Sequence, residues 1–272
     1  MIFNNKLQKL YAILIIRTQN VKDFCVWIKW YEHFIKCDKI VIINDNSDFS
    51  LLPYINQYNN IILIPALYDN YLQKENYNII IHNILKPNKN DIILIPDADE
   101  FWWYDTKKFI SLQHCLNTER ERLKTNCICV PWVNMMSQEL LKSRPWDCDF
   151  TEFCTYRIGS EFIEYKPIIF YDENYKIENI HYGLSDYKVI SEKSEYINIF
   201  GKVLYDYHLR LYHYRITTID EYQNKLRSCL NKKVLVNNKR FYMNEDINTY
   251  LASTNQYPYK EDLTVLNILK TI

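Results

Sequence analysis

Two aspartates in the first half of the chain have the type and spacing that metal chemistry requires. Asp97 and Asp99 follow the apolar run 91–95, which is typical of a buried strand. In an extended chain, residues i and i+2 project to the same side, so we expect both carboxylates to face one point. Two like charges that close repel each other unless a cation is present. The pair predicts a site for Mg²⁺ or Mn²⁺ completed by water and phosphate oxygens; the alternative is a capped turn with solvated acids.

Glycine is scarce in this sequence, because only Gly159, Gly183 and Gly201 occur in 272 residues. Their spacing excludes the P-loop and the glycine-rich dinucleotide fingerprint, and with them P-loop nucleotide hydrolysis and ordinary dinucleotide dehydrogenation. Phosphate would have to be held by other means, and a metal on Asp97 and Asp99 is the candidate. The 33 Lys and Arg residues balance 33 Asp and Glu residues. This balance argues against a nucleic-acid-binding protein that works by neutralising phosphates.

Strand-like and helix-like segments alternate over the first hundred residues. Apolar runs predict strands at 11–16, 39–43, 61–64 and 91–95, and helical spacing of apolar residues predicts helices over 24–34 and 77–85. This alternation is typical of a parallel sheet with helices on both faces. Such sheets bind ligands outside the carboxyl ends of their strands. Because the polar clusters 17–20, 45–48 and 97–100 all follow strands, we expect them to converge on one cleft.

The second half of the chain has a less regular pattern. We predict strands at 127–133, 166–171 and 209–212 and helices over 109–124 and 219–230. Residues 134–160 carry few regular signals, and irregular segments that long are often functional. No repeat or low-complexity linker divides the chain. The expected fold class is therefore α/β, a single domain over residues 1–272 with a mostly parallel central sheet flanked by helices.

The cysteines and apolar runs bear on the compartment. The eight cysteines contain no C-x-x-C pair, and Cys127 and Cys129 alternate along a predicted strand. We therefore expect free, buried thiols in a reducing cytosol rather than disulfides or a zinc site. The apolar run 11–16 is too short for a signal peptide, and nothing approaches the roughly 20 apolar residues of a membrane span. The sequence predicts a soluble cytoplasmic protein without a membrane span.

Four short motifs follow one another between about residues 11 and 230. They are Arg17-x-x-Asn20 before a helix with Trp27 and Trp30, the D-A-D-E-F of residues 97–101, Pro131-Trp132 with Lys166-Pro167-Ile168, and the H-Y-R of residues 213–215 with Glu221, Tyr222 and Lys225. In this order they resemble glycosyltransferases of family 92 and their relatives in family 2. Each motif alone is weak, whereas four in family order are fairly specific.

The resemblance implies a GT-A fold and the transfer of a sugar from a nucleotide-sugar donor. It favours a UDP-sugar over a GDP-sugar, Mn²⁺ or Mg²⁺ as cofactor, a glycan or other hydroxyl-bearing acceptor, and inversion at the anomeric carbon. It also implies a nucleotide-sugar-binding half at 11–125, an acceptor-binding half at 126–230 and a helical C-terminal extension at 231–272. Nucleic acid is not an expected partner.

Site residues follow from the resemblance position by position. Arg17, Asn20 and Asp45 would line the nucleotide pocket, with Asp45 near the base. Asp99 would hold the metal directly, while Asp97 would lie beside the metal or reach the ribose. His213 matches the position of a third metal ligand, and a neutral imidazole suits Mn²⁺.

Inversion requires a general base within about 3 Å of the acceptor hydroxyl. The candidates are in the irregular segment, where we favour Glu152, then Asp147, with Asp149 as a further acid. Trp132 and Trp146 would either stack on an acceptor sugar or fill the core. Two departures from the family pattern leave the nucleotide and the acceptor open. Gln19-Asn20 stands where relatives often have Asn-Glu, and residues 135–137 replace a Phe-Gly pair.

Two other functions remain open on the sequence alone. A metal-dependent nucleotidyltransferase also uses carboxylates at strand ends, but it normally has a glycine-rich loop early in the chain, and this chain has no glycine before Gly159. A catalytically silent nucleotide-binding or sugar-binding module would keep the fold alone. The presence of Asp97, Asp99 and His213 argues against that second alternative.

Overall fold

The computed structural model of the chain describes residues 7–17, 20–47, 49–66, 73–137, 143–145, 147–158, 165–174, 176–177, 188–189, 208–214, 218, 220 and 259–272. By their contacts the residues form two compact units. Unit 1 comprises Met1–Trp132, Ile163–Leu211 and Ile272, and unit 2 comprises Val133–Phe162 and Tyr212–Thr271. These bounds do not coincide with the halves that the sequence predicted at 11–125 and 126–230, and that division stays a prediction.

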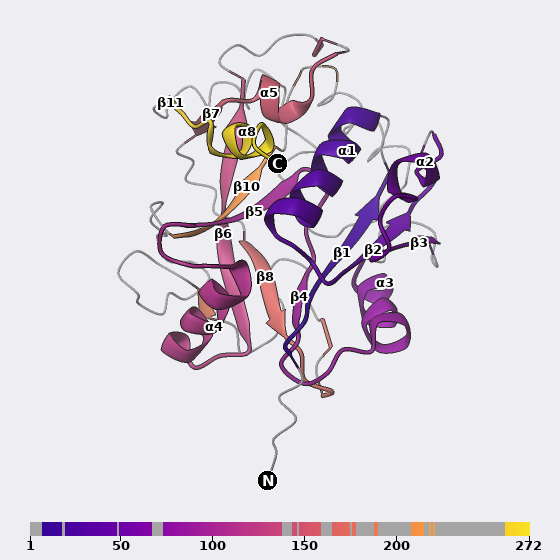
Figure 1. Ribbon diagram of the computed structural model, residues 1–272, viewed down its shortest axis with the longest axis vertical. Helices are drawn as coiled ribbons and strands as arrows, with labels where there is room; N and C mark the ends of the chain where they lie inside the picture. Colours follow the sequence, from indigo (N-terminus) through magenta and orange to yellow (C-terminus); the bar gives the residue numbers. More distant parts are fainter. Residues whose placement is uncertain are drawn as a thin grey trace, which may run out of the picture. The chain divides into compact units, whose positions relative to one another are not determined.

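Strands and helices alternate from β1 to β4, whereas further along the described chain several strands follow one another (Figure 1). The strands are β1 Leu10–Ile16, β2 Lys39–Asn44, β3 Ile61–Pro65, β4 Ile92–Leu94, β5 Glu100–Tyr104, β6 Cys127–Met136, β7 Tyr156–Ile158, β8 Tyr165–Phe170, β9 Lys188–Val189, β10 Leu209–His213 and β11 Tyr259–Glu261. The helices are α1 Val21–Lys29, α2 Leu52–Ile55, α3 Gln73–Ile79, α4 Leu112–Leu123, α5 Phe150–Phe153 and α8 Thr264–Leu269, with the π-helical turns η1 Trp30–Phe34 and η2 Ile80–Leu85. Apart from residue 220, the predicted helix over 219–230 lies outside the described residues.

The predicted parallel sheet is confirmed in unit 1. Its strands lie in the order β4-β1-β2-β3, and Ile13 of β1 pairs with Val41 of β2, which in turn pairs with Ile62 of β3. Beyond β4 the sheet continues antiparallel through β8 and then β6, since Leu94 and Ile128 both pair with Ile168. The fold class is therefore α/β, with a parallel block extended on one side by antiparallel strands.

Both faces of this sheet are buried, which explains why its strands are continuous apolar runs rather than alternating ones. On one face Ile13, Val41 and Ile93 pack with Tyr77 and Ile80 from α3 and η2. Side chains alternate along a strand, so Leu10, Ala12 and Leu14 point to the opposite face, and they are fully buried as well.

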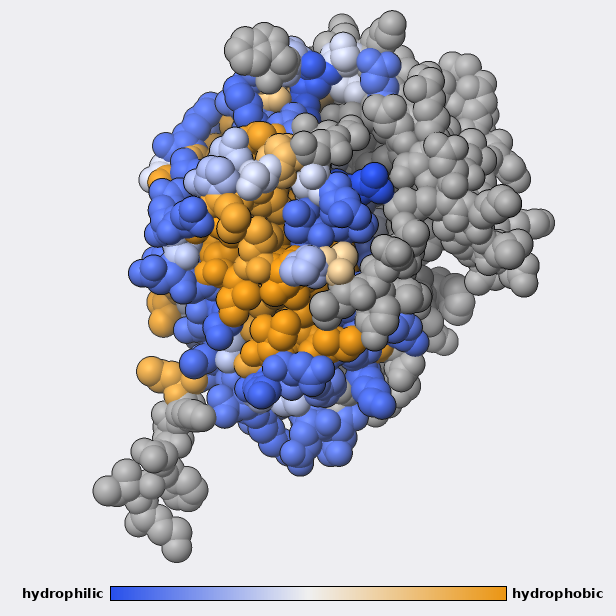
Figure 2. All heavy atoms as spheres, turned by 90° about the vertical axis from the view of Figure 1, so that its right-hand side faces the viewer, coloured by the Kyte–Doolittle hydropathy of each residue, from blue (hydrophilic) through white to orange (hydrophobic). Residues whose placement is uncertain are grey.

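The sheet ends at β3, which is hydrogen-bonded to β2 on its inner side. Residues 61–64 of this strand are all apolar and half-buried. Figure 2 faces this side of the molecule and shows apolar side chains gathered in one band. Among the helices that the structure describes, none is long and apolar enough to cross a bilayer.

Unit 2 is built around the end of β6. Met135 and Met136 pair with β7, which pairs antiparallel with β11. The short helix α5 begins with a capping box, in which Asp149 accepts the backbone N–H of Glu152 while the Glu152 carboxylate accepts the N–H of Asp149. Phe150 of α5 stacks on Tyr214 at a ring distance of 5.1 Å. The segment expected to be irregular is therefore partly regular and locally capped.

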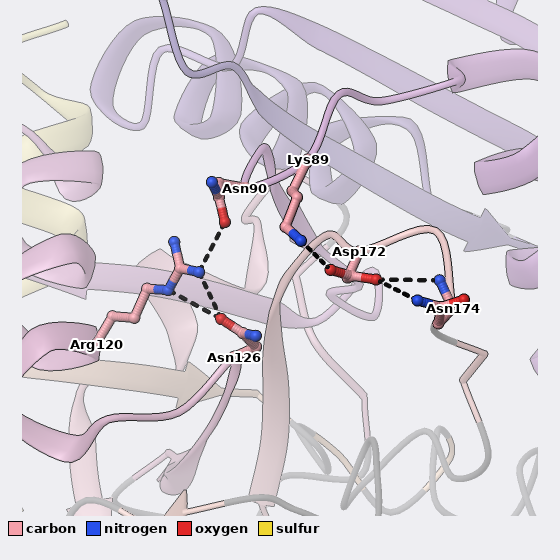
Figure 3. A network of polar contacts seen from close by, with 6 residues as sticks. All are labelled: Lys89, Asn90, Arg120, Asn126, Asp172 and Asn174. Atoms are coloured by element: carbon pink, nitrogen blue, oxygen red, sulfur yellow. Dashed lines mark hydrogen bonds and ion pairs between the residues drawn. The ribbon is translucent and has the colours of Figure 1, made fainter.

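The amino end of β4 carries a network of polar contacts in unit 1, drawn in Figure 3. We call it the amino-end network. The Arg120 guanidinium donates to the side-chain oxygens of Asn90, at 2.7 Å, and Asn126, at 3.0 Å, and lies over the Phe170 ring. Beside them Lys89 pairs with Asp172 at 3.0 Å. These contacts join the turn before β4 to α4 and to the ends of β6 and β8.

The seven described cysteines form no disulfide, and five of them are buried. The expectation of buried thiols without disulfides is confirmed for these five, whereas Cys25 and Cys148 are only half-buried and Cys229 lies outside the described part of the chain. Burial raises the pKa of the Cys115 thiol to about 12, which keeps it protonated and unreactive at neutral pH.

Candidate active site

Residues 97–100 form a turn at the carboxyl end of β4, and we call it the acid turn. The backbone N–H of Glu100 donates to the carbonyl of Asp97 at 3.1 Å, which closes the turn. The Glu100 carboxylate reaches back and accepts the N–H of Asp97 at 2.7 Å. The prediction that Asp97 and Asp99 lie on an extended strand is therefore wrong: the chain bends before β5 begins at Glu100, so strand alternation does not decide where the two carboxylates point.

A buried lysine faces the acid turn from β8. The Lys166 ammonium lies 2.8 Å from the Asp97 carboxylate and 3.2 Å from the Glu100 carboxylate. The side chains of Lys166 and Glu100 are fully buried, whereas that of Asp97 is 31% exposed. A charge is expensive to bury unless it is paired. The three side chains therefore form a partly buried ion cluster in which only Asp97 reaches the surface.

Burial and mutual charge shift the pKa values of this cluster. Burial raises the pKa of Glu100 to about 8, because Lys166 offsets only part of that effect and Asp97 adds to it. Burial alone would lower the pKa of Lys166, but the carboxylates of Asp97 and Glu100 outweigh it and raise the value. Burial, then the nearby Asp97 carboxylate, raises the pKa of Tyr77. Lys166 and Tyr77 therefore stay protonated at neutral pH, while Glu100 can gain or lose a proton.

Two buried aromatic residues of one helical segment hold the backbone of the acid turn. The indole N–H of Trp27 donates to the Asp97 carbonyl, and the Tyr31 hydroxyl donates to the Glu100 carbonyl, both at 3.1 Å. The predicted helix over 24–34 thus exists as α1 and η1. Its apolar face fixes the turn rather than merely filling the core.

The ends of β1 and β2 lie at the same edge of the sheet as the acid turn, as predicted from their parallel order. Asp45 follows β2 and is half-buried, and its N–H donates to the Ile16 carbonyl at 2.8 Å. Asn20 is the N-cap of α1, where its side chain accepts the N–H of Lys22 at 2.9 Å. Arg17 is exposed. A nucleotide-binding role of these three residues stays a prediction.

The predicted third metal ligand and the predicted general bases belong to unit 2. His213 is buried and its Nδ1 lies 3.3 Å from the side-chain oxygen of Asn134. Asp147 and Glu152 are exposed, and Glu152 has a structural task in the capping box of α5. Trp132, in unit 1, is 6% exposed and so fills the core instead of presenting a face to a sugar. Trp146 and Arg215 lie outside the described residues.

The chemistry of the acid turn fits a divalent cation. Asp97 is partly exposed and Asp99 is half-buried, and carboxylate oxygens are the hard donors that Mg²⁺ and Mn²⁺ prefer. In the described part of the chain, no three His, Cys, Asp or Glu side chains gather closely enough to hold a metal by themselves. Mg²⁺ often needs only one or two carboxylates, because water and substrate phosphates supply its other ligands. The donors fit a cation that arrives together with a nucleotide.

Lys166 and Tyr77 are the residues whose place in the site the sequence did not reveal. Lys166 was visible only as part of a motif, and Tyr77 only as a position on an apolar helix face. One signal could have identified Lys166: it is the single charged residue in the strand Tyr165–Phe170, whose positions are all buried. A lysine within a buried strand implies a carboxylate partner.

No protein-family model matches this sequence, and no curated protein matches it. Among solved structures, S. aureus TarS 1-349 aligns at 11% identity over 92% of this chain and 73% of that chain, with a TM-score of 0.37. A 4-diphosphocytidyl-2C-methyl-D-erythritol synthase from Anaerococcus prevotii aligns at 11% identity over 70% of this chain and 90% of that chain, with a TM-score of 0.36. Another structure of such a synthase aligns at 12% identity over 51% of this chain and 64% of that chain, with a TM-score of 0.35. The chain therefore spans less than two thirds of the length of that synthase. Scores this low carry no argument, so the α/β class rests on the observed sheet and the family resemblance on its motifs.

Proposed function

We propose that this chain is a metal-dependent glycosyltransferase of GT-A type that moves a sugar from a nucleotide-sugar donor to an acceptor hydroxyl. The observation that supports it best is the acid turn, which lies at the carboxyl end of β4 within the parallel block and is held by a buried ion pair. Ligands of α/β sheets bind at this edge. The order of the four motifs supports the same function.

The acid turn would hold the divalent cation through Asp99 and Asp97, with water and the phosphates of the donor as its other ligands. The role of His213 as a further ligand stays a prediction from the sequence. A bound cation would offset the negative charge that develops on the leaving nucleoside diphosphate. The protein's own residues would position the donor: Asp45 at the adjacent strand end would contact the base, and Arg17 and Asn20 would line the pocket. Because the acid turn is anchored by Trp27 and Tyr31, its carboxylates need little rearrangement when a donor binds.

The acceptor side of the proposal is carried by unit 2. Glu152, and Asp147 after it, are proposed as the general base that removes the proton of the acceptor hydroxyl during an inverting displacement. Both carboxylates are exposed, as a group that meets an incoming acceptor must be. The expected donor is a UDP-sugar rather than a GDP-sugar, and the acceptor is a glycan or another hydroxyl-bearing molecule.

A donor panel tests this function. UDP-sugars and GDP-sugars are incubated with the protein, with Mn²⁺ or with EDTA, and the release of nucleoside diphosphate is measured. We expect slow hydrolysis of at least one donor with Mn²⁺ only, and its loss in Asp99→Asn. The matched control is Asp172→Asn, which removes a carboxylate from the opposite end of the sheet and should leave the rate unchanged.

Other outcomes assign other functions. If nucleoside triphosphates release pyrophosphate while nucleotide sugars stay intact, the chain is a nucleotidyltransferase. If no donor is hydrolysed but one binds, it is a binding module. If no nucleotide binds with or without Mn²⁺, the proposed function is wrong.

A further inference from the structure

Lys166 is the one buried Lys or Arg side chain among the described residues. An ammonium group in a protein interior is costly unless carboxylates surround it, and removing one partner of such a pair leaves an uncompensated charge. The resemblance and the sequence pattern gave this residue no role of its own. Its partners, however, both belong to the acid turn.

The sheet fixes where the Lys166 side chain begins. On one side β8 pairs with β6, with Lys166 opposite Val130, and on the other side it pairs with β4, with Ile168 opposite Leu94. Lys166 lies two residues before Ile168 in this antiparallel register, and so beside the chain that leaves β4 for the acid turn. A residue held between two strands has little freedom to follow a moving partner.

The Lys166 ammonium acts on the two contacts that give the acid turn its shape. It lies 3.2 Å from Oε2 of Glu100, the same oxygen that accepts the Asp97 N–H at 2.7 Å. It also lies 2.8 Å from Oδ2 of Asp97. The other Glu100 oxygen, Oε1, is buried without a hydrogen-bond partner in the described part of the chain. Without Lys166, Asp97 and the buried Glu100 would lose the cation that they share. They would then either repel each other as two carboxylates, or Glu100 would take up a proton; in both cases the ion contacts that hold the turn are lost.

We propose that Lys166 is a positioning residue: it keeps the acid turn closed and so presents Asp97 and Asp99 to the cation that accompanies the nucleotide. This inference rests on the proposed function for its ligand, but not for its local effect on the turn. Lys166 itself touches neither donor nor metal, since its side chain is fully buried. Its effect is carried by Asp97 and Glu100.

The experiment compares two pairs of proteins. The first pair is the native chain and Lys166→Met. The second pair is Glu100→Gln and the double variant that carries both Glu100→Gln and Lys166→Met. In the second pair the buried acid is already gone, so the double variant folds even if Lys166→Met alone does not. Lys89→Met is the matched control, because it breaks an ion pair whose lysine is 75% exposed at the opposite end of the sheet. Two readouts are taken on each protein: amide hydrogen exchange at residues 97 and 100, and the affinity for UDP in the presence of Mn²⁺ by calorimetry, with GDP as the second probe.

We expect Lys166→Met to speed exchange at residues 97 and 100 by about a hundredfold, far more than over the rest of the sheet, and to weaken Mn²⁺-dependent binding about tenfold. In the second pair both effects should be smaller, about tenfold on exchange and about threefold on binding, because only the Asp97 contact is lost. Lys89→Met should match the native chain within about twofold in both readouts. These results would support the positioning role.

The inference is overturned if exchange at residues 97 and 100 stays at the native rate in both pairs, or rises only as much as exchange everywhere else. It is also overturned if the turn opens while the affinity for Mn²⁺ and nucleotide is unchanged, and in that case the proposed function still stands. If the native chain binds neither UDP nor GDP with Mn²⁺, the proposed function fails, and the exchange data alone still decide whether Lys166 closes the turn.

Discussion

The two ends of β4 each carry a buried acid, and the two acids are satisfied in different ways. At the amino end Asp91 accepts the backbone N–H groups of Lys9 and Asn88, at 2.9 and 2.7 Å, and lies within reach of the Tyr11 hydroxyl. At the carboxyl end Glu100 shares Lys166 with Asp97 and keeps one oxygen without a hydrogen-bond partner in the described part of the chain. Neutral hydrogen-bond donors therefore stabilise Asp91, whereas Glu100 depends on the Lys166 ammonium, which it shares with Asp97.

This difference separates a structural anchor at Asp91 from the candidate site at the acid turn. Backbone donors that are fixed by the fold hold Asp91 in place, so this acid has a structural role. The neighbouring amino-end network of Figure 3 connects the same turn to α4 and to the end of β8. The acid turn instead presents the partly exposed carboxylate of Asp97 and the half-buried Asp99, which can take part in binding a further cation. Perturbed, partly buried acids are typical of functional sites. Substitutions at the two ends should therefore affect different properties of the protein.

The largest effect is expected at the anchor. Asp91→Ala removes the acceptor for two partly buried backbone N–H groups and one buried hydroxyl, and it should lower the free energy of unfolding by about 3 kcal/mol. Urea unfolding followed by circular dichroism measures this loss. The nucleotide affinity of the molecules that stay folded should not change. A stable Asp91→Ala protein with lost nucleotide binding would contradict the separation of the two ends.

The second effect should appear in activity and not in stability, which is the reverse of the first. Asp99→Asn should reduce Mn²⁺-dependent release of nucleoside diphosphate about a hundredfold, or about 2.7 kcal/mol in activation free energy. Its unfolding midpoint should match the native one, because the half-buried side chain keeps its size and its hydrogen-bonding capacity. Initial rates and thermal melts of the same preparation make the comparison. Equal rates in the native chain and in Asp99→Asn would remove Asp99 from the proposed site.

A third, smaller effect concerns pH. Burial raises the pKa of Glu100 to about 8, against an ordinary value of 4.5, with Lys166, Asp97 and Tyr77 as its charged or titratable neighbours. A raised pKa means that the folded state holds the proton more tightly, so this stability is fully present below pH 4.5 and is lost as the pH rises through 8. The native chain should therefore lose about 1 to 2 kcal/mol relative to Glu100→Gln between pH 6 and pH 8.

Urea unfolding of both proteins across this pH range, in EDTA, measures the difference. Glu100→Gln is the suitable reference because its amide oxygen can still accept the Asp97 N–H. A constant difference between the two proteins would show that Glu100 is ionised throughout, held so by Lys166. An increasing advantage of the native chain with rising pH would reverse the sign of the argument.

The sequence predicted the parallel block because each of its strands is a local apolar run, which requires no knowledge of the partner strand. The edge proposed for the site followed from the order of the strands. The shape of the acid turn did not follow, since the turn depends on the Glu100 side chain reaching back to the Asp97 N–H. The role of Lys166 depends on the antiparallel register of β8 against β4, a non-local pairing that periodicity does not reveal.

For Glu152, unlike Lys166, the sequence contained a local signal of its structural role. The acids Asp149 and Glu152 have the three-residue spacing of a capping box, and the structure shows that box at the start of α5. Their spacing therefore has a structural explanation. A catalytic role of Glu152 needs the additional support of a kinetic test on Glu152→Gln, which can keep the cap while it removes the base.

The smallest effect is expected at the exposed ion pair near the amino end of β4. Lys89 and Asp172 form an ion pair at 3.0 Å, but the lysine side chain is 75% exposed, and water and salt screen such pairs. Lys89→Met should change the free energy of unfolding by no more than about 0.5 kcal/mol, and 1 M salt should remove even that difference. The equivalent substitution at the buried lysine, Lys166→Met, should instead open the acid turn. Comparable losses from the two methionine variants would show that burial does not distinguish the two ends of β4, and the contrast between anchor and site would then have to be abandoned.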